Sequence, residues 1–256
     1  MDATDAAAVP PPSVVPARPS RHPILPIERF GAFIEVLLCS GVPTQLLVFG
    51  GLAGLGIPHQ TADGGWSPTF VVAMSLIDMV LVVGLVVLFL RAHHEPLADF
   101  VRGPRRPLRE VALGLLLIPG AVVVVVLVLT AVLAFKPELH NVPVNPFERM
   151  MQTPRDAAVF ALVVMLAGGV REEVQRGFIV RRFDQYLGGG LVGVAIYSVV
   201  FGLGHIEQGY AAAIATGALG ALWGCVYYVR RSIVAPMISH AGFNLGQLVK
   251  YVSLGN

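Results

Sequence analysis

Polar and ionisable side chains interrupt three stretches of this 256-residue chain that are otherwise apolar. A carboxylate can accept a proton from water, and an amide or an imidazole can donate a hydrogen bond to a developing oxyanion. Because an ionisable group inside a membrane helix is costly, such groups by default indicate a functional site. The residues are Glu172, Glu173, Arg176, His205, His240 and Asn244.

The first polar group lies in GGVREEVQRGF (168–178), which continues an apolar run. Arg176 follows Glu172 by four positions and Glu173 by three, so it can pair with either carboxylate on the same helix. Such a pair would offset part of the cost of burial. One interpretation is therefore a structural ion cluster that fixes helix packing, and the other is half of a catalytic site.

The spacing of the three groups predicts that they meet inside the bilayer. Glu172 precedes the glycine turn at 188–190 by 16 residues, and His205 follows that turn by 15 residues. At about 1.5 Å per residue, both lie about 22–24 Å from the turn and are level on antiparallel helices. His240 and Asn244 are four residues apart, so they share a helix face.

The composition indicates that membrane helices position these residues. The chain is 55% hydrophobic and 13% charged, with a mean hydropathy of +0.72, whereas soluble domains carry about 25% charged residues. We expect an all-α polytopic membrane protein with about seven transmembrane helices, within a range of six to eight. The first of these helices, near the N-terminus, could instead be two short helices with a break near Pro43. The expected spans are 30–56, 69–91, 110–135, 156–179, 190–206, 209–229 and 232–251.

The flanking segments give an orientation and a domain organisation. Residues 1–28 are rich in proline and are predicted to form a disordered cytoplasmic tail, and residues 29–256 a helical membrane domain. With the N-terminus inside, twelve Lys and Arg residues flank the spans on the cytoplasmic side and four on the other, as the positive-inside rule requires. We expect an integral, multi-pass protein of a bacterial inner membrane.

Charge and cysteine content exclude other classes of protein. A formal net charge of +2 without a basic cluster does not suggest nucleic-acid binding. Cys39 and Cys225 are expected to be buried and unpaired.

Glu35 and Asp78 are expected either to pair with polar neighbours or to line a polar cavity. Trp223 is expected to be an interfacial or packing residue.

In order, the three polar groups resemble the motifs of the CAAX-protease and bacteriocin-processing family of intramembrane endopeptidases, which includes type II CAAX prenyl endopeptidases. EEVQRG resembles its double-Glu motif, FGLGH (201–205) its F-x-x-x-H motif, and HAGFN (240–244) its H-x-x-x-N motif. The resemblance covers about residues 110–251, which would be the protease-like core.

The resemblance implies a role for each residue. Glu172 would activate a water, His205 would share it, and His240 and Asn244 would lie on the oxyanion side. The catalytic residues would be Glu172, Glu173, His205, His240 and Asn244, with Arg176 and Phe201 shaping the site. Members of the family have been described both as metalloproteases and as glutamate proteases. A zinc ion held by Glu172, His205 and His240 therefore stays an open prediction.

The first motif departs from the family pattern, in which three residues separate the Glu pair from the Arg. Here only Val174 and Gln175 intervene. An alignment on the Arg puts Arg171 at the catalytic position, whereas an alignment on the Glu pair rotates the Arg by about 100°. A local helix irregularity could absorb this rotation, and Gly168 and Gly169 lie just upstream.

These observations predict an intramembrane endopeptidase that hydrolyses a membrane-associated peptide or protein, with the prenylated CAAX type as one substrate class. Its partners would be membrane lipid and a membrane-bound substrate, with no nucleic acid. The alternative is a non-catalytic scaffold or immunity-type protein that keeps the fold. A proton-coupled transporter that uses Glu35 and Asp78 is a third alternative, and the lack of internal repeats disfavours it.

Overall fold

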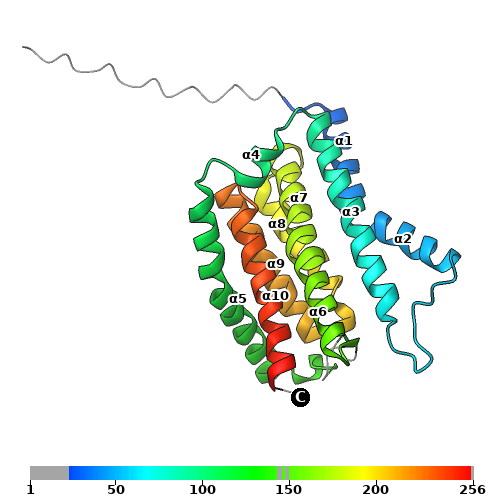
Figure 1. The fold of residues 1–256 in the computed structure, drawn as a ribbon. Helices are drawn as coiled ribbons and strands as arrows, with labels where there is room; N and C mark the ends of the chain where they lie inside the picture. The colour runs from blue at the N-terminus through cyan, green and yellow to red at the C-terminus, as the bar shows by residue number, and fades with distance from the viewer. Residues whose placement is uncertain (1–22, 143–145, 148–149, 255–256) are drawn as a thin grey trace, which may run out of the picture.

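The computed structural model describes residues 23–142, 146–147 and 150–254, which fold into helices joined by short connections (Figure 1). The α-helices are α1 (Pro26–Cys39), α2 (Val42–Gly54), α3 (Pro68–Ala92), α4 (Leu97–Arg102), α5 (Pro107–Phe135), α6 (Pro154–Val163), α7 (Glu172–Tyr186), α8 (Gly190–Leu203), α9 (Tyr210–Arg230) and α10 (Val234–Leu254). A π-helix, Val164–Arg171, joins α6 to α7. The predicted all-α polytopic fold is confirmed.

The helices form two groups (Figure 1). Helices α1, α2 and α3 lie along one side of a bundle that contains α5 and α7 to α10. Among the described residues, four segments are long and apolar enough to cross a membrane: α1 with α2, α3, α5 and α9. Helix α8 is apolar but has only 14 residues. The number of seven spans therefore stays a prediction.

Large apolar side chains cover the outside of the molecule, as lipid contact requires. Leu108 is 83% exposed and Phe135 is 81% exposed. Cys225 is also exposed on α9, so the expectation that both cysteines are buried holds only for Cys39. A small apolar side chain fits the outer surface of a membrane bundle because the surrounding lipid is as apolar as a protein core.

The predicted break near Pro43 is present, with Gly41 as its centre. Helix α1 ends at Cys39, and Gly41 has a φ angle of 86° before α2 begins. Pro43 lies in the first turn of α2, where the missing N–H group costs nothing. The positive φ angle favours glycine here, and a Cβ atom on Gly41 would lie 2.5 Å from Arg171 Nη2, the end of a flexible side chain.

The start of the domain differs slightly from the expectation. Helix α1 begins at Pro26, inside the segment 1–28 that was predicted to be a disordered tail. Leu25 N donates a hydrogen bond to Glu28 Oε2 at 2.7 Å, which gives the first turn a local partner. Residues 1–22, and with them most of the predicted tail, lie outside the described residues.

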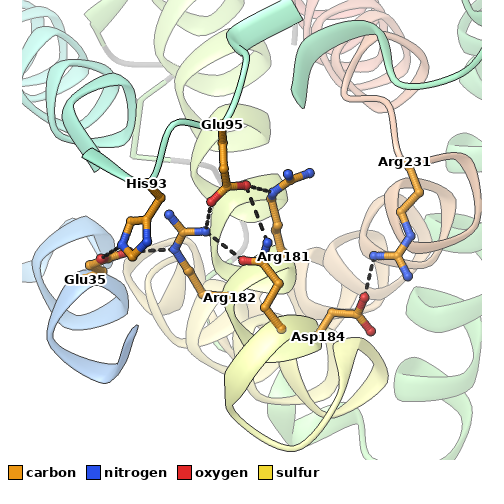
Figure 2. A network of polar contacts seen from close by, with 8 residues as sticks. Glu35, His93, Glu95, Arg181, Arg182, Asp184 and Arg231 are labelled. Atoms are coloured by element: carbon orange, nitrogen blue, oxygen red, sulfur yellow. Dashed lines mark hydrogen bonds and ion pairs between the residues drawn. The ribbon is translucent and has the colours of Figure 1, made fainter. Parts of the chain in front are cut away.

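A network of ion pairs ties α1, the α3–α4 connection and α7 together (Figure 2). Arg182 is fully buried and donates through Nε to Glu35 Oε2 at 2.6 Å, and through Nη1 to Glu95. His93 Nε2 lies 2.5 Å from Glu35 Oε1, and Arg181 also donates to Glu95. The predicted orientation counts Arg181 and Arg182 among the twelve cytoplasmic Lys and Arg residues. Both side chains, however, take part in these ion pairs. The cytoplasmic N-terminus therefore stays a prediction.

The network predicts a loss of stability in acid. Partial burial alone would raise the pKa of Glu95, but the hydrogen bonds and charges of Arg182 and Arg181 lower this pKa below its ordinary value of 4.5. A depressed carboxyl pKa contributes stability above the ordinary value, and this contribution disappears as the pH falls through the folded-state value. We expect thermal stability in detergent to decline below about pH 4.5 and Glu95→Gln to flatten that decline.

Asp99→Asn provides the matched control, because Asp99 lies on the neighbouring helix α4 and is exposed. It should leave the pH profile of the melting temperature unchanged. An unaltered acid decline in Glu95→Gln would show that the Arg181–Arg182–Glu95 contacts do not set it.

Candidate active site

A cavity of about 680 Å³ is lined by residues of α2, α3 and α6 to α10, and it brings the predicted residues together. Glu172 from α7, His205 from the end of α8, and His240 and Asn244 from α10 all line it. The prediction that the three polar groups meet is therefore confirmed. Apolar side chains make up much of the remaining wall, including Val163, Phe160, Leu219, Phe243 and Leu248.

Glu173 lies behind the cavity wall and is 1% exposed. Arg176, which is completely buried, donates a hydrogen bond to Glu173 rather than to Glu172. His240 Nδ1 also lies 2.8 Å from Glu173 Oε1. The paired carboxylate thus holds a histidine of another helix, whereas Glu172 faces the cavity.

Aromatic rings enclose this buried pair. The Arg176 guanidinium lies 4.5 Å from the centre of the Phe201 ring and 5.5 Å from that of Trp223, within the range of cation–π attraction. The Trp223 ring stacks on His240 with 3.9 Å between centroids and an interplanar angle of 18°. The packing role expected for Trp223 is confirmed, but its contact with His240 could not be seen in the sequence.

The hydrogen bonds of the two histidines define which ring nitrogen faces the site. A carboxylate and a carbonyl can only accept, so His240 Nδ1 donates to Glu173, and His205 Nδ1 donates to the Phe201 carbonyl at 2.8 Å. In the neutral form, each Nε2 is then unprotonated. His240 Nε2 lies 3.7 Å from Glu172 Oε2, a distance too long for a direct hydrogen bond, so both atoms can contact a common water.

Asn244 offers an amide donor at the same cavity. Its Nδ2 atom lies 3.5 Å from the Val164 carbonyl, the limit of a hydrogen bond. A Cβ atom on Gly168 would lie 2.5 Å from this Nδ2 atom. The π-helix and α10 therefore approach closely here, and the weakly held amide can reorient towards a bound substrate.

The π-helix lies at the predicted irregularity, but Glu172, Glu173 and Arg176 all belong to the regular helix α7, so it does not change the angle between the Glu pair and Arg176. It ends at Arg171, directly before the Glu pair. Arg171 also lines the cavity, but its guanidinium donates to Asp78 on α3. Asp78 in turn lies 2.5 Å from the Thr44 hydroxyl. Asp78 was expected to pair or to line a cavity, but nothing in the sequence identified Arg171 as its partner.

The donor atoms of the site can be compared with those that a metal ion prefers. Two unprotonated Nε2 atoms and a carboxylate would suit Zn²⁺ by type. Among the described residues, however, no group of three or more His, Cys, Asp or Glu side chains is placed to hold a metal ion. Zinc therefore stays a prediction.

Comparison with known proteins identifies the part of the chain that carries this site. Residues 154–246 match the model of a family described as type II CAAX prenyl endopeptidase Rce1-like. No curated protein and no solved structure matches the chain. The matched segment runs from the start of α6 into α10 and contains the Glu pair, both histidines and Asn244. Residues 154–246 of this integral membrane protein are thus similar to the Rce1-like type II CAAX prenyl endopeptidase family.

Proposed function

We propose that this protein is an intramembrane endopeptidase in which Glu172 activates the attacking water. One observation carries the proposal: Glu172, His205, His240 and Asn244 come from three separate helices and line one cavity. A purely structural ion cluster would need the buried Glu173–Arg176 pair, but it would not need a second carboxylate facing two histidines across a cavity.

The reaction follows from the donors and acceptors. Glu172 takes a proton from the water while the oxygen adds to the carbonyl carbon of the scissile peptide bond. The second hydrogen of the same water is accepted by the unprotonated Nε2 atom of His205 or of His240, which orients the water. The Asn244 amide donates to the oxyanion that forms. The C–N bond then breaks, and the leaving amine takes the proton from Glu172.

This assignment moves His240 from the oxyanion side to the water side. Its Nδ1–H group is used by Glu173, so a neutral His240 has no proton left to donate to an oxyanion. Glu173, Arg176 and Trp223 are positioning residues because they fix the orientation and the tautomer of the imidazole. The same logic operates in catalytic triads, where a buried carboxylate holds the histidine.

The cavity also indicates the class of substrate. Its volume of about 680 Å³ falls in the range that holds a short peptide or a similar ligand. Apolar side chains line much of it, while the polar groups lie together at the site of hydrolysis. These features suit a membrane-associated peptide, including one with a prenylated C-terminal cysteine.

Cleavage by the purified protein in liposomes tests the proposal. We would offer quenched fluorescent peptides with and without a farnesylated C-terminal cysteine to wild type, to His240→Ala and to protein-free liposomes. We expect wild type to cleave at least one peptide class and His240→Ala to lose about 10²-fold in rate, because the attacking water loses an acceptor that orients it. A chelator arm tests the prediction of zinc.

The alternative function predicts another outcome. A scaffold or immunity-type protein would cleave no peptide, and His240→Ala would keep the cellular phenotype at an unchanged protein level. That combination would overturn the endopeptidase. Equal cleavage by wild type and His240→Ala would show that the activity comes from a contaminant or from another site.

A further inference from the structure

A second, smaller pocket adjoins the main cavity at Arg171 and Glu172. It has a volume of about 140 Å³ and is formed by α2, α3 and the π-helix. Its lining residues are Gln45, Met74, Ser75, Asp78, Ala167, Arg171 and Glu172. Five of these seven are polar. Gln45, Ser75, Ala167, Arg171 and Glu172 also line the main cavity, so the side pocket adjoins it at Glu172.

Two of the polar side chains lack a partner within the protein. In the described part of the chain, neither the Gln45 amide nor the Ser75 hydroxyl makes a side-chain hydrogen bond, whereas Asp78 is held by Arg171 and Thr44. A polar group that leaves bulk water without a new partner costs free energy. Ser75 is half-buried and Gln45 is exposed, and both line the pocket, so water that enters the pocket can bond to them.

The size of the pocket fits that partner. A water occupies about 30 Å³ in the liquid, so the pocket has room for about four. Each would find several hydrogen-bonding groups, as an ordered buried water requires. Asp78 and Arg171 offset each other's charge, which leaves the carboxylate of Glu172 as the other charged group of the pocket.

We propose that the side pocket is a water site that supplies Glu172, with Gln45, Ser75 and the Asp78–Arg171 pair as its walls. This inference rests on the proposed function. Each turnover consumes one water: its oxygen enters the new carboxyl group, and its hydrogens pass to that carboxyl group and to the leaving amine. The side pocket adjoins the main cavity at Glu172, so water held there lies next to the base when a substrate fills the main cavity.

The presence of water can be measured without any peptidase assay. X-ray radiolysis of bound water generates hydroxyl radicals that oxidise adjacent side chains, and Met74 lines the pocket. Met79 on the same helix lines neither cavity and is the internal control. For full-length protein in nanodiscs, we expect mass spectrometry to show sulfoxide forming faster at Met74 than at Met79. Ser75→Leu, which fills the pocket, should bring Met74 down to the Met79 rate.

The supply role needs a kinetic measurement on the same proteins. Ser75→Leu should lower kcat about tenfold, because it removes water from the chemical step. Ser75 also lines the main cavity, so kcat and not KM is the readout. Ser75→Ala keeps the space open and should lower kcat much less, which separates blocked water from a folding defect. Leu248→Ala, a change in the main cavity wall, should act mainly on KM.

The outcomes separate the two proposals. Equal labelling of Met74 and Met79 in wild type would overturn the water site. Labelling that Ser75→Leu abolishes while kcat stays unchanged would overturn the supply role. If wild type cleaves nothing, the proposed function fails, and with it the supply role, while the Met74 result still decides whether the pocket holds water.

Discussion

Glu172→Gln lowers the rate of peptide cleavage by about 10²–10⁴-fold, the range for loss of a general base. The amide keeps the size of the side chain but cannot take a proton from water. Glu172 makes no ion pair with Arg176, which donates to Glu173 instead, so the fold should survive. The measurement is the single-turnover rate in liposomes beside the melting temperature of the same protein.

Glu207→Gln is the matched control, because Glu207 lies close in sequence to His205 but is exposed. It should retain the wild-type rate. If Glu172→Gln retains that rate as well, the base must be another group, and Glu173 and His240 become the candidates. A large loss in Glu173→Gln does not distinguish the two carboxylates, because this change also releases His240.

Arg176→Met destabilises the protein by about 3–5 kcal/mol, the cost of removing one partner of a buried ion pair. Arg176 is fully buried against Glu173, Phe201 and Trp223. Methionine fills part of the space but leaves the Glu173 carboxylate with His240 alone. Reversible unfolding in mixed SDS micelles would give the free energy of unfolding.

A double variant tests the cause of this loss. Glu173→Gln combined with Arg176→Met removes both charges and should recover most of the stability lost in Arg176→Met alone. Arg105→Met, in an exposed connection, should change the free energy of unfolding by less than about 0.5 kcal/mol. If the double variant is as unstable as the sum of both single variants, packing on the aromatic rings and not the ion pair explains the loss.

Hydropathy and proline placement predicted most of the fold because lipid leaves the backbone few alternatives. A valine-rich run such as that of α5 must be helical where no water can bond the backbone. The break around Gly41 was predicted from Pro43, because proline lacks the N–H group that a continuous helix needs. Sequence reasoning was weaker for α6, α7 and α10, whose polar residues lower their hydropathy, so their boundaries depend on tertiary contacts.

The meeting of Glu172 and His205 was predictable because of where the irregularity lies. The depth of Glu172 was measured from the glycine turn at 188–190, and the regular helix α7 covers that whole distance. The π-helix ends at Arg171, on the other side of Glu172. It therefore changes the direction of earlier residues without altering this distance.

Which carboxylate faces the cavity could not be predicted from spacing alone. Arg176 is within helical reach of both Glu172 and Glu173, and only the position of His240 on α10 decides between them. The Arg171–Asp78 pair joins residues 93 positions apart. Such long-range pairs depend on how helices pack, which the local pattern does not encode.

The short helix α8 has a consequence for the surrounding membrane. Its 14 residues rise about 21 Å, whereas the hydrocarbon core of a typical bilayer is about 30 Å thick. Its outer face carries Leu191, Ile196 and Val199, which are exposed. A bilayer accommodates a hydrophobic surface that is shorter than its own core by becoming thinner next to it. The bilayer is then thinner beside the His205 end of the cavity. The acyl-chain length of the surrounding lipid therefore affects this protein.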